Sequence, residues 1–407
     1  MPSLSTARYR DALTLPRVPL TFGTALLARS AYALVLLPLF YAVVEATGSI
    51  ALAGSALALY GAAASLLAPV RASLIDRYGA RSVLTILIVL FSGTLGAQAT
   101  TSLTGGSGMQ LLILAAIGGA VAPPVGPTMR VAWGSLTPNA ELLKKGLSFD
   151  AVIEELLYLV GPAVSGLALA FIVPGMALII PAVLVLVGGL LFVVTPTVGA
   201  MKARDRHAPQ IGDEKLTLRP LILDARFVGL LLPALIAGSV AGSLSVAVPV
   251  TLAAYGGSAA AGIALGLFAG GSALGGLMYG ALAVPGSPAR QLVVLSVALL
   301  VGTSLVAVVT GAVAVSVVLV VAGLFFSPVM IVTYVAAHAA GGVHQQNSAM
   351  TWVNTSHNVG GATGSALAGV LIQAAGVPAA IGGIALGALL LLGLSAVLSG
   401  RRVRSAV

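Results

Sequence analysis

Between two apolar runs, at residues 49–70 and 82–103, the chain reads Ala72-Ser73-Leu74-Ile75-Asp76-Arg77-Tyr78-Gly79-Ala80-Arg81. Each flanking run is long enough to cross the roughly 30 Å hydrocarbon core of a bilayer as an α-helix. Backbone groups in lipid must be hydrogen-bonded internally, so we expect both runs to be helices. The decapeptide is then a charged loop at one membrane surface, from which the other spans can be counted.

The composition of the whole chain is that of a membrane protein. Its 407 residues are 58% hydrophobic and 8% charged, with a mean hydropathy of +1.09, values far from those of soluble domains. The ninth and tenth spans are weakly separated, because Thr310-Gly311-Ala312 is the only punctuation there. We expect an all-α membrane protein with twelve spans, at residues 20–44, 49–70, 82–103, 109–134, 146–172, 176–197, 227–252, 257–284, 291–312, 313–337, 349–374 and 377–399.

The positions of Lys and Arg indicate the orientation, because cytoplasmic loops hold an excess of both residues. With twelve spans, 18 of the 20 basic residues fall in the two termini and in the even-numbered loops. The other two, Arg29 and Arg130, fall inside spans. An error of one span would break this segregation. We therefore predict cytoplasmic N and C termini, and the high Ala, Gly and Val content suggests a bacterial cytoplasmic (inner) membrane.

The same distribution excludes several function classes. The net charge of +9 is spread along one membrane face, so it does not indicate nucleic-acid binding. With no Cys and four scattered His, the chain offers no convergent nucleophile and no metal cluster. We expect no enzyme activity, no metal and no cofactor. The expected partners are a small-molecule substrate and the lipid bilayer, with no nucleic acid, and a monomer is expected.

One long polar stretch, residues 198–226, divides the spans six and six. It predicts an N-terminal six-helix bundle at 1–197, a cytoplasmic linker at 198–226 and a C-terminal six-helix bundle at 227–407. Weak similarity between residues 148–162 and 348–362 supports a duplication. The pattern favours two parallel halves around a site near the membrane midplane.

The decapeptide resembles the Gly-x-x-x-Asp-Arg-x-Gly-Arg-Arg/Lys loop of the major facilitator superfamily. Ala72 and Ala80 depart from that pattern, while the core Asp-Arg-x-Gly-x-Arg is intact. The resemblance implies the twelve-helix major facilitator fold and a cytoplasmic gate motif that latches the two halves, formed by Asp76, Arg77, Gly79 and Arg81. The alternative is that Arg71, Arg77 and Arg81 only direct membrane insertion.

Gly161-Pro162, in the fifth predicted span, is similar to the Gly-Pro-x-x-Gly-Gly end of a motif found in exporters that exchange substrate for protons. Ser165 replaces one glycine of that ending, and Leu157 stands where an earlier glycine would fall. Proline removes a backbone donor and bends a helix. The element is therefore either part of an antiport machinery or an ordinary kink.

Charged residues inside the spans suggest a proton-coupling network of Glu154, Glu155, Arg29, Arg130 and Asp150. The two arginines balance the two glutamates, as a membrane-embedded site requires. Glu154 and Arg29 lie at matching depth, and Asp150 shares an i, i+4 face with Glu154. One glutamate would neutralise an arginine permanently, and the other would face the cavity and carry a proton. The alternative is a static ion-pair network.

A polar patch on the eleventh span is predicted to contact substrate, with interhelical hydrogen bonding as the alternative. His357 in this patch is the group well inside a second-half span that can titrate near neutral pH, because the last of the 11 acidic residues is Asp224. The expected substrate cavity comprises Tyr32, Tyr158, Trp352, Asn354, His357 and Asn358.

These patterns favour a secondary active transporter that works by alternating access, with proton-coupled efflux (antiport) of small organic molecules or drugs. The proton gradient would supply the energy in place of a cofactor. One alternative is a proton-coupled uptake symporter for a sugar, nucleoside or amino acid. A non-transporting membrane scaffold or receptor is the alternative of another class.

Overall fold

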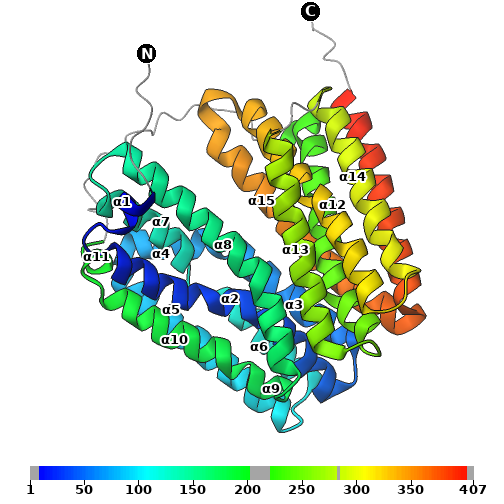
Figure 1. Cartoon of the computed structure of the whole chain (residues 1–407), viewed down its shortest axis with the longest axis horizontal. Coiled ribbons are helices and arrows are strands. Elements are labelled where there is room, and N and C mark those ends of the chain that lie inside the picture. The colour runs from blue at the N-terminus through cyan, green and yellow to red at the C-terminus, as the bar shows by residue number, and fades with distance from the viewer. Residues whose placement is uncertain (1–8, 202–220, 282–284, 401–407) are drawn as a thin grey trace, which may run out of the picture.

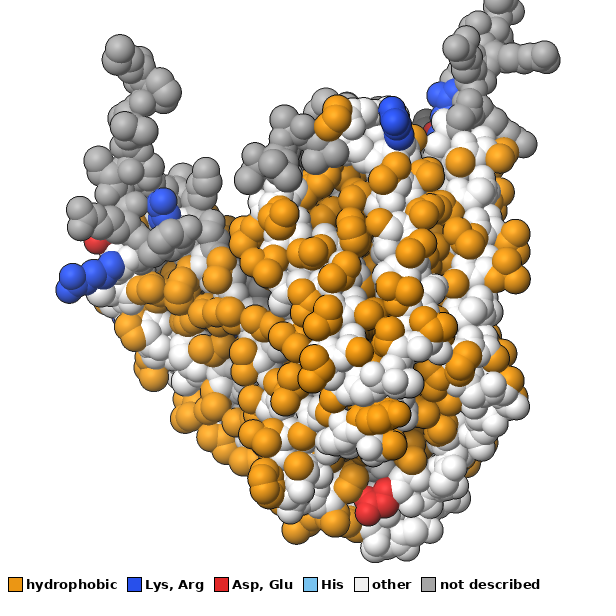
Figure 2. Space-filling model, turned by 45° about the vertical axis from the view of Figure 1, so that its right-hand side comes forward, with side chains coloured by type: hydrophobic (Ala, Val, Ile, Leu, Met, Phe, Trp, Pro, Cys, Tyr) orange, Lys and Arg blue, Asp and Glu red, His pale blue; other side chains and the backbone are white. Residues whose placement is uncertain are grey.

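The computed structural model describes residues 9–201, 221–281 and 285–400, and helices make up most of these ranges. Two groups of helices meet at one end of the molecule and diverge toward the other end, where the first and last described helical segments lie (Figure 1). An apolar surface covers the middle of the molecule, and Lys and Arg side chains lie at the diverging end (Figure 2). Ten described helices, or up to eleven with one bent pair, are long and apolar enough to cross a membrane.

The N-terminal half contains two spans that are broken inside the apolar region. The run at 49–70 forms α3 and α4, which are bent by 41° relative to each other. The run at 109–134 forms one candidate span, Gly108–Leu136, as predicted, but its helix is interrupted near the middle. Pro123 and Pro124 lack backbone N–H groups, so the first helix ends and α7 begins after them. The helices are α1 (Tyr9–Leu13), α2 (Val18–Thr47), α3 (Ile50–Leu66), α4 (Ala68–Tyr78), α5 (Ala80–Leu103), α6 (Gly108–Val121), α7 (Val125–Leu136), α8 (Ala140–Leu169), α9 (Pro174–Ala177), α10 (Ile179–Val194) and α11 (Pro196–Gly199).

The C-terminal half begins after residues 202–220 of the predicted linker, which lie outside the described ranges. Gly311, with a φ of 89°, directly precedes α15, which confirms the weakly marked boundary at that position. The elements are η1 (Leu221–Leu223), α12 (Ala225–Leu252), α13 (Gly257–Ala281), α14 (Pro288–Ser304), η2 (Leu305–Ala307) and α15 (Ala312–Gly400).

The residues of α15 do not form one straight helix. The rings of Phe326 and His357 lie 5.8 Å apart, whereas a straight helix would separate these residues by about 46 Å. The chain therefore reverses between them. A second reversal falls near Gly376, whose φ is 82°, because a Cβ on Gly383 would lie 3.5 Å from the Leu371 side chain. The predicted runs at 313–337, 349–374 and 377–399 are separated by these reversals.

Side-chain caps begin several helices at the positions where the polar punctuation predicts a start. Ser49 accepts a hydrogen bond from the Leu52 amide at the start of α3. Ser107 and Gln110 form a capping box at the start of α6. The Asn139 side chain accepts a hydrogen bond from the Leu142 amide at the start of α8. Each cap satisfies backbone donors that would otherwise be left unpaired.

Small residues join the two halves in a seam, which we define as the contacts of α3 with α15 and of α8 with α13. A Cβ on Gly54 of α3 would lie 2.4 Å from the Ser365 carbonyl oxygen of α15. A Cβ on Gly262 of α13 would lie 2.1 Å from the Pro162 carbonyl oxygen of α8. Gln373 of α15 also accepts hydrogen bonds from the start of α3. Backbones approach this closely only where side chains are absent, so the seam closes one end of the molecule.

We expect Gly262→Val to force the seam open, because the added side chain must displace α8 from α13. Overpacking of this kind costs about 1–3 kcal/mol, which corresponds to a shift of roughly 5- to 150-fold in a two-state equilibrium. The chain has no natural Cys, so Ala368→Cys, at a fully buried position of the cluster beneath the seam, provides a single reporter. The thiol labelling rate in purified protein should rise by about tenfold or more.

Gly382→Val is the matched control, because no atom lies within 4 Å of a Cβ at that position. Equal labelling rates in the Gly262→Val and Gly382→Val backgrounds would contradict the assignment of the seam as the closed end.

Candidate functional site

A cavity of about 430 Å³ lies between the two halves, and both halves supply its walls. From the N-terminal half, α2 contributes Arg29 and Tyr32, and α8 contributes Glu154 and Tyr158. From the C-terminal half, α15 contributes Asn354, Asn358, Thr351 and Thr355. The structure thus brings six predicted site residues to one cavity, together with two threonines that sequence reasoning did not select.

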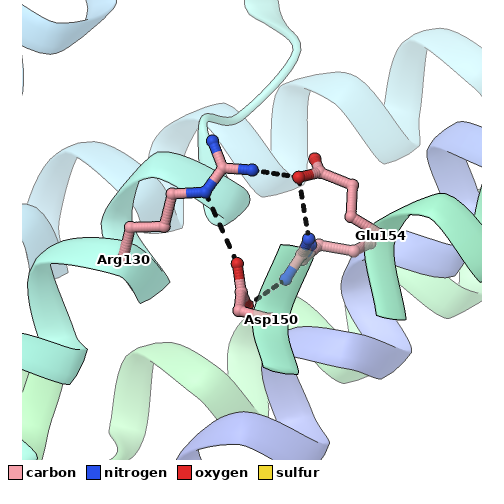
Figure 3. A network of polar contacts seen from close by, with 4 residues as sticks. Arg130, Asp150 and Glu154 are labelled. Carbon is pink, nitrogen blue, oxygen red and sulfur yellow. Dashed lines mark hydrogen bonds and ion pairs between the residues drawn. The ribbon is translucent and has the colours of Figure 1, made fainter. Parts of the chain in front are cut away.

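Four charged side chains of the N-terminal half form an ion-pair network (Figure 3), and two of them, Arg29 and Glu154, line the cavity. Arg29 Nη1 lies 2.6 Å from Asp150 Oδ1, and Arg29 Nη2 lies 3.4 Å from Glu154 Oε2. Arg130 Nε lies 3.4 Å from Asp150 Oδ2, and the Arg130 guanidinium also pairs with Glu154. Two positive and two negative charges therefore balance within one cluster that links α2, α7 and α8.

Burial differs strongly between the members of this network. Asp150 is fully buried and Arg29 is 3% exposed, whereas Glu154 is 27% and Arg130 is 46% exposed. A buried pair is held by the low dielectric around it, while a partly exposed pair is screened by water. Arg29 and Asp150 therefore form the fixed pair of the network. Glu154 and Arg130 form the responsive pair, whose contact can change with protonation or with access of water.

The pairing pattern in the structure differs in detail from the predicted one. The sequence suggested two arginines balanced by Glu154 and Glu155, and the structure places Asp150 in the network as the second carboxylate. The side chain of Glu155 lies outside the described part of the structure. Asp150 and Glu154 stand one turn apart on α8, so both reach the same arginines.

Arg71 was assigned to the charged loop, and this assignment is wrong. Its side chain is buried, with 6% of its surface exposed, and it lines the cavity. Its guanidinium donates to the carbonyl oxygens of Gly119 and Ala120 at 3.2 and 2.9 Å, and to that of Ala64. These carbonyls end α6 and α3, which break at this depth. Arg71 was not predicted as a cavity residue because it directly follows the apolar run and so looks like a surface residue. The sequence signal for a helix break near it was the pair of prolines at 123–124.

Two predicted cavity residues of α15 lie elsewhere. Trp352 packs against the cluster that contains Phe227 and Leu231. His357 contacts Phe326 edge-on, with the ring centroids 5.8 Å apart. Neither is among the residues that line the cavity. Among the described residues, no group of three or more His, Asp or Glu could hold a metal ion.

Comparison with known proteins identifies the family of this fold. The model of the Major Facilitator Superfamily matches residues 20–343. The chain belongs to the major facilitator superfamily. No curated protein matches it by sequence.

Solved structures of similar fold cover nearly the whole chain. A mutant of the nucleoside transporter NupG aligns with a TM-score of 0.73 at 16% identity, over 93% of this chain and 98% of that one. A POT family transporter in complex with 5-aminolevulinic acid aligns at 0.68 and 13%, over 95% and 96%. A bacterial homolog of the human lysosomal transporter Spinster, inward-facing and occupied, aligns at 0.64 and 13%, over 94% of each chain. At these identities the likeness shows the fold.

The superfamily's loop motif is described except for the side chain of Asp76. Arg77 is exposed and lies over the ring of Tyr78 at 5.2 Å. Gly79 has a φ of 85°, which favours glycine at this tight turn between α4 and α5. Arg81 donates to the carbonyl oxygens of Val193 and Val194 at the end of α10. The described contacts of Arg81 therefore lie within the N-terminal half, at the end where the two halves diverge.

The Gly161-Pro162 element lies where α8 meets α2 and α13. A Cβ on Gly161 would lie 2.5 Å from the Ala33 side chain of α2. The Pro162 carbonyl faces Gly262, as described for the seam. The helix continues through Pro162 to Leu169. The element therefore lets α8 pack closely on both halves at the closed end of the molecule.

The burial difference predicts different stability costs for two conservative substitutions. Asp150→Asn leaves Arg29 without its close partner in a buried position, which costs about 3–5 kcal/mol. Glu154→Gln removes a partly exposed partner, so it should cost roughly 1 kcal/mol or less. Thermal unfolding of the purified protein should show a much larger fall in Tm for Asp150→Asn. Equal falls for both variants would contradict the division into a fixed and a responsive pair.

Proposed function

We propose that this member of the major facilitator superfamily is a proton-coupled secondary transporter that exports small organic molecules in exchange for protons. The observation that carries the proposal is the position of Glu154. It is a carboxylate that lines the cavity between the halves and pairs with both embedded arginines. A group with this placement can exchange a proton with the cavity and alter the charge network in the same step.

The topology that supports this function has twelve spans and cytoplasmic termini. Ten candidate spans become twelve when the bent pair α3–α4 is counted and residues 349–399 are divided at Gly376. A continuous helix of that segment's 51 residues would be about 76 Å long, more than twice the hydrocarbon core. The basic residues at the diverging end favour a cytoplasmic location for that end, in a bacterial inner membrane. The described conformation is then open to the cytoplasm.

Proton loading on Glu154 would remove one negative charge from the balanced network. Arg29 keeps Asp150 at 2.6 Å as a buried partner, so its charge stays neutralised. Arg130 loses its closer carboxylate and retains only the 3.4 Å contact with Asp150. Because Arg130 is 46% exposed, it can move toward water. The protonation state of Glu154, which lines the cavity, thereby sets the position of a neighbouring cation.

The C-terminal wall supplies neutral polar groups. Asn354 and Asn358 lie one turn apart on α15 and line the cavity opposite α2 and α8. Amide side chains offer both donors and acceptors, so they can orient a polar substrate without adding charge. These residues supply substrate contacts, while the N-terminal half supplies the proton chemistry. The proton gradient takes the place of a cofactor, and the transporter works as a monomer in the bilayer.

A second candidate is proton-coupled uptake of a nucleoside or another polar nutrient. Similarity in fold to the nucleoside transporter NupG supports a nucleoside as the candidate substrate, whereas the Gly161-Pro162 element favours exchange. Glu154 would carry the proton in either case. The sign of the proton flux relative to the substrate flux distinguishes the two, and a scaffold or receptor would show no coupled flux.

Liposomes that contain purified protein and an internal pH dye test the coupling. Substrate-triggered proton movement should fall at least tenfold in Glu154→Gln, because the amide cannot carry a proton. A panel of labelled nucleosides, sugars, amino acids and cationic dyes serves as the set of candidate substrates. Glu155→Gln is the paired variant, since it changes the adjacent acid of the same helix.

Full coupled flux in Glu154→Gln would remove Glu154 as the carrier, and loss in Glu155→Gln alone would transfer that role to its neighbour. If protons leave the liposome as substrate enters it, the transport is exchange. If protons and substrate enter together, the transport is symport.

Asn354→Ala and Asn358→Ala should weaken substrate binding without uncoupling it. Each lost hydrogen bond costs about 0.5–1.5 kcal/mol, so KM should rise roughly 2- to 12-fold per substitution. The ratio of protons to substrate should stay unchanged. Thr363→Ala, at a position of α15 that does not line this cavity, is the matched control. An unchanged KM in both asparagine variants would contradict their role in substrate contact.

A further inference from the structure

Arg71 lies at a place where two membrane helices break. It stands on α4, just past the bend that follows α3, and its guanidinium reaches the carbonyl ends of α3 and α6. Carbonyl groups at a helix C-terminus carry partial negative charge and hold a cation in place. They fix the guanidinium at the cavity wall, but they are neutral groups and leave its charge uncompensated.

The charged side chains that the structure describes around the cavity do not balance when Arg71 is included. The network of Arg29, Arg130, Asp150 and Glu154 contains two charges of each sign. Arg71 forms no ion pair with any carboxylate among the described side chains. The C-terminal half contributes no acid beyond Asp224. Among the side chains that the structure describes, which do not include that of Glu155, one positive charge is therefore left at a buried site. An unpaired charge in such a place costs about 3 kcal/mol or more.

The guanidinium also retains donor capacity. Its Nε–H is buried without a hydrogen-bond acceptor in the described structure. A guanidinium has five N–H donors, and the contacts to the three carbonyl groups leave donors over. Buried polar groups of this kind are normally satisfied, so an exception points to a partner that binds at this position.

A helix N-terminus lies beside Arg71 at the same wall. The helix α7, twelve residues long, begins at Val125 after Pro124, which offers no side-chain cap. Val125 and Gly126 line the cavity with Arg71. The Val125 amide already donates to the Pro123 carbonyl, and the third residue of the helix is a proline without an N–H, so the Gly126 amide is the one left in the first turn. This end of the helix attracts negative charge, as do half-helix N-termini in transporter sites. A carboxylate that capped this end would serve both groups.

Tyr32 connects this corner to the charge network. Its hydroxyl donates to the Pro123 carbonyl at 2.6 Å, and Tyr32 lines the cavity together with Arg71 and Arg29. A ligand that contacts Arg71 therefore lies beside the arginine that Asp150 and Glu154 neutralise. Ser65 adds a hydroxyl donor to the same cavity wall.

We propose that Arg71 and the N-terminus of α7 form a subsite for an anionic group, so that the transporter selects small organic monoanions. The inference rests on the proposed function, because it names the chemical class of the transported molecule. A carboxylate or phosphate ester monoanion supplies the missing negative charge and accepts the unused N–H donors. The described charges of the loaded cavity and its ion-pair network then balance, which favours closure of the cavity within the membrane.

Binding to the purified full-length protein in detergent tests the subsite without a gradient. The probes are three matched pairs that differ in charge at one group: benzoate and benzamide, nicotinate and nicotinamide, and indole-3-acetate and indole-3-acetamide. At least one acid should bind tenfold or more tightly than its amide in wild type, measured by equilibrium dialysis. The preference should fall below twofold in Arg71→Gln and persist in Arg71→Lys, which keeps the charge.

Arg290→Gln is the matched control, because Arg290 is exposed on α14 and away from the cavity. Size-exclusion chromatography and helical circular dichroism verify that each variant is folded. If Arg71→Gln does not fold, the wild-type preference and its retention in Arg71→Lys decide the question. The proposal is overturned if every amide binds as well as its acid, or if folded Arg71→Gln keeps the preference.

The outcome is separable from that of the coupling experiment. Acid-selective binding that depends on Arg71, without substrate-driven proton flux, would leave the subsite and remove the coupled transport. Coupled flux of neutral compounds, with no preference for acids over amides, would support the coupled transport and remove the anion subsite.

Discussion

The buried ion pair between Arg29 and Asp150 is the constraint on which the cavity wall depends. Both side chains are nearly inaccessible, and their 2.6 Å separation joins α2 to α8. In an apolar environment either charge alone would be costly, so the two helices must keep this register for the bundle to be stable. Glu154 and Arg130 are then added at the exposed side of a fixed pair. Glu154 can change its protonation state within the membrane because the Arg29–Asp150 pair keeps α2 and α8 in place.

A second constraint concerns the backbone. Where α3 gives way to α4 and α6 to α7, carbonyl and amide groups lose their intrahelical partners inside the apolar region. Irregular backbone at membrane depth is tolerated where it is buried in protein or lines a cavity. The Arg71 guanidinium satisfies carbonyl groups at both breaks. The breaks create the polar corner of the cavity, and a single arginine from α4 stabilises them.

Much of the fold was predictable from sequence, because lipid imposes a simple rule on the backbone. Apolar runs of sufficient length had to be helical, and punctuation such as Gly311 marked their ends. The broken spans were missed because hydropathy averages over Pro123 and Pro124 without registering the lost N–H groups. Arg71 was misassigned for a related reason, since a run that ends at Arg71 looks like a run that reaches the membrane surface.

Prediction of the site succeeded where helix periodicity fixed the geometry. The i, i+4 relation places Asp150 and Glu154 on one face of α8, and Asn354 and Asn358 on one face of α15. Sequence could not assign the partners of each arginine, because these depend on how α2, α7 and α8 pack. It also placed Trp352 and His357 at the cavity, although both pack against other residues of the C-terminal half. The matching positions of Arg29 and Glu154 along their helices were predictable, whereas the rotation of α15 about its own axis was not.

The two halves differ in chemistry, and this difference identifies the element that must connect them. Charge chemistry belongs to the N-terminal half, and the described wall of the C-terminal half offers neutral groups, so proton binding cannot act across the cavity by ion pairing. Within the described structure, α8 carries both Glu154 in the charge network and Gly166 in the seam against α13. These residues are separated by about 18 Å of one helix. A change in the ion pairs that Arg29 and Arg130 form with α8 can therefore displace the seam through α8 itself, which continues as one helix past Pro162. No chain of side-chain contacts between the two sites is required. The glycines of the seam make that transmission possible, because contacts between backbones allow helices to slide where interlocked side chains would resist.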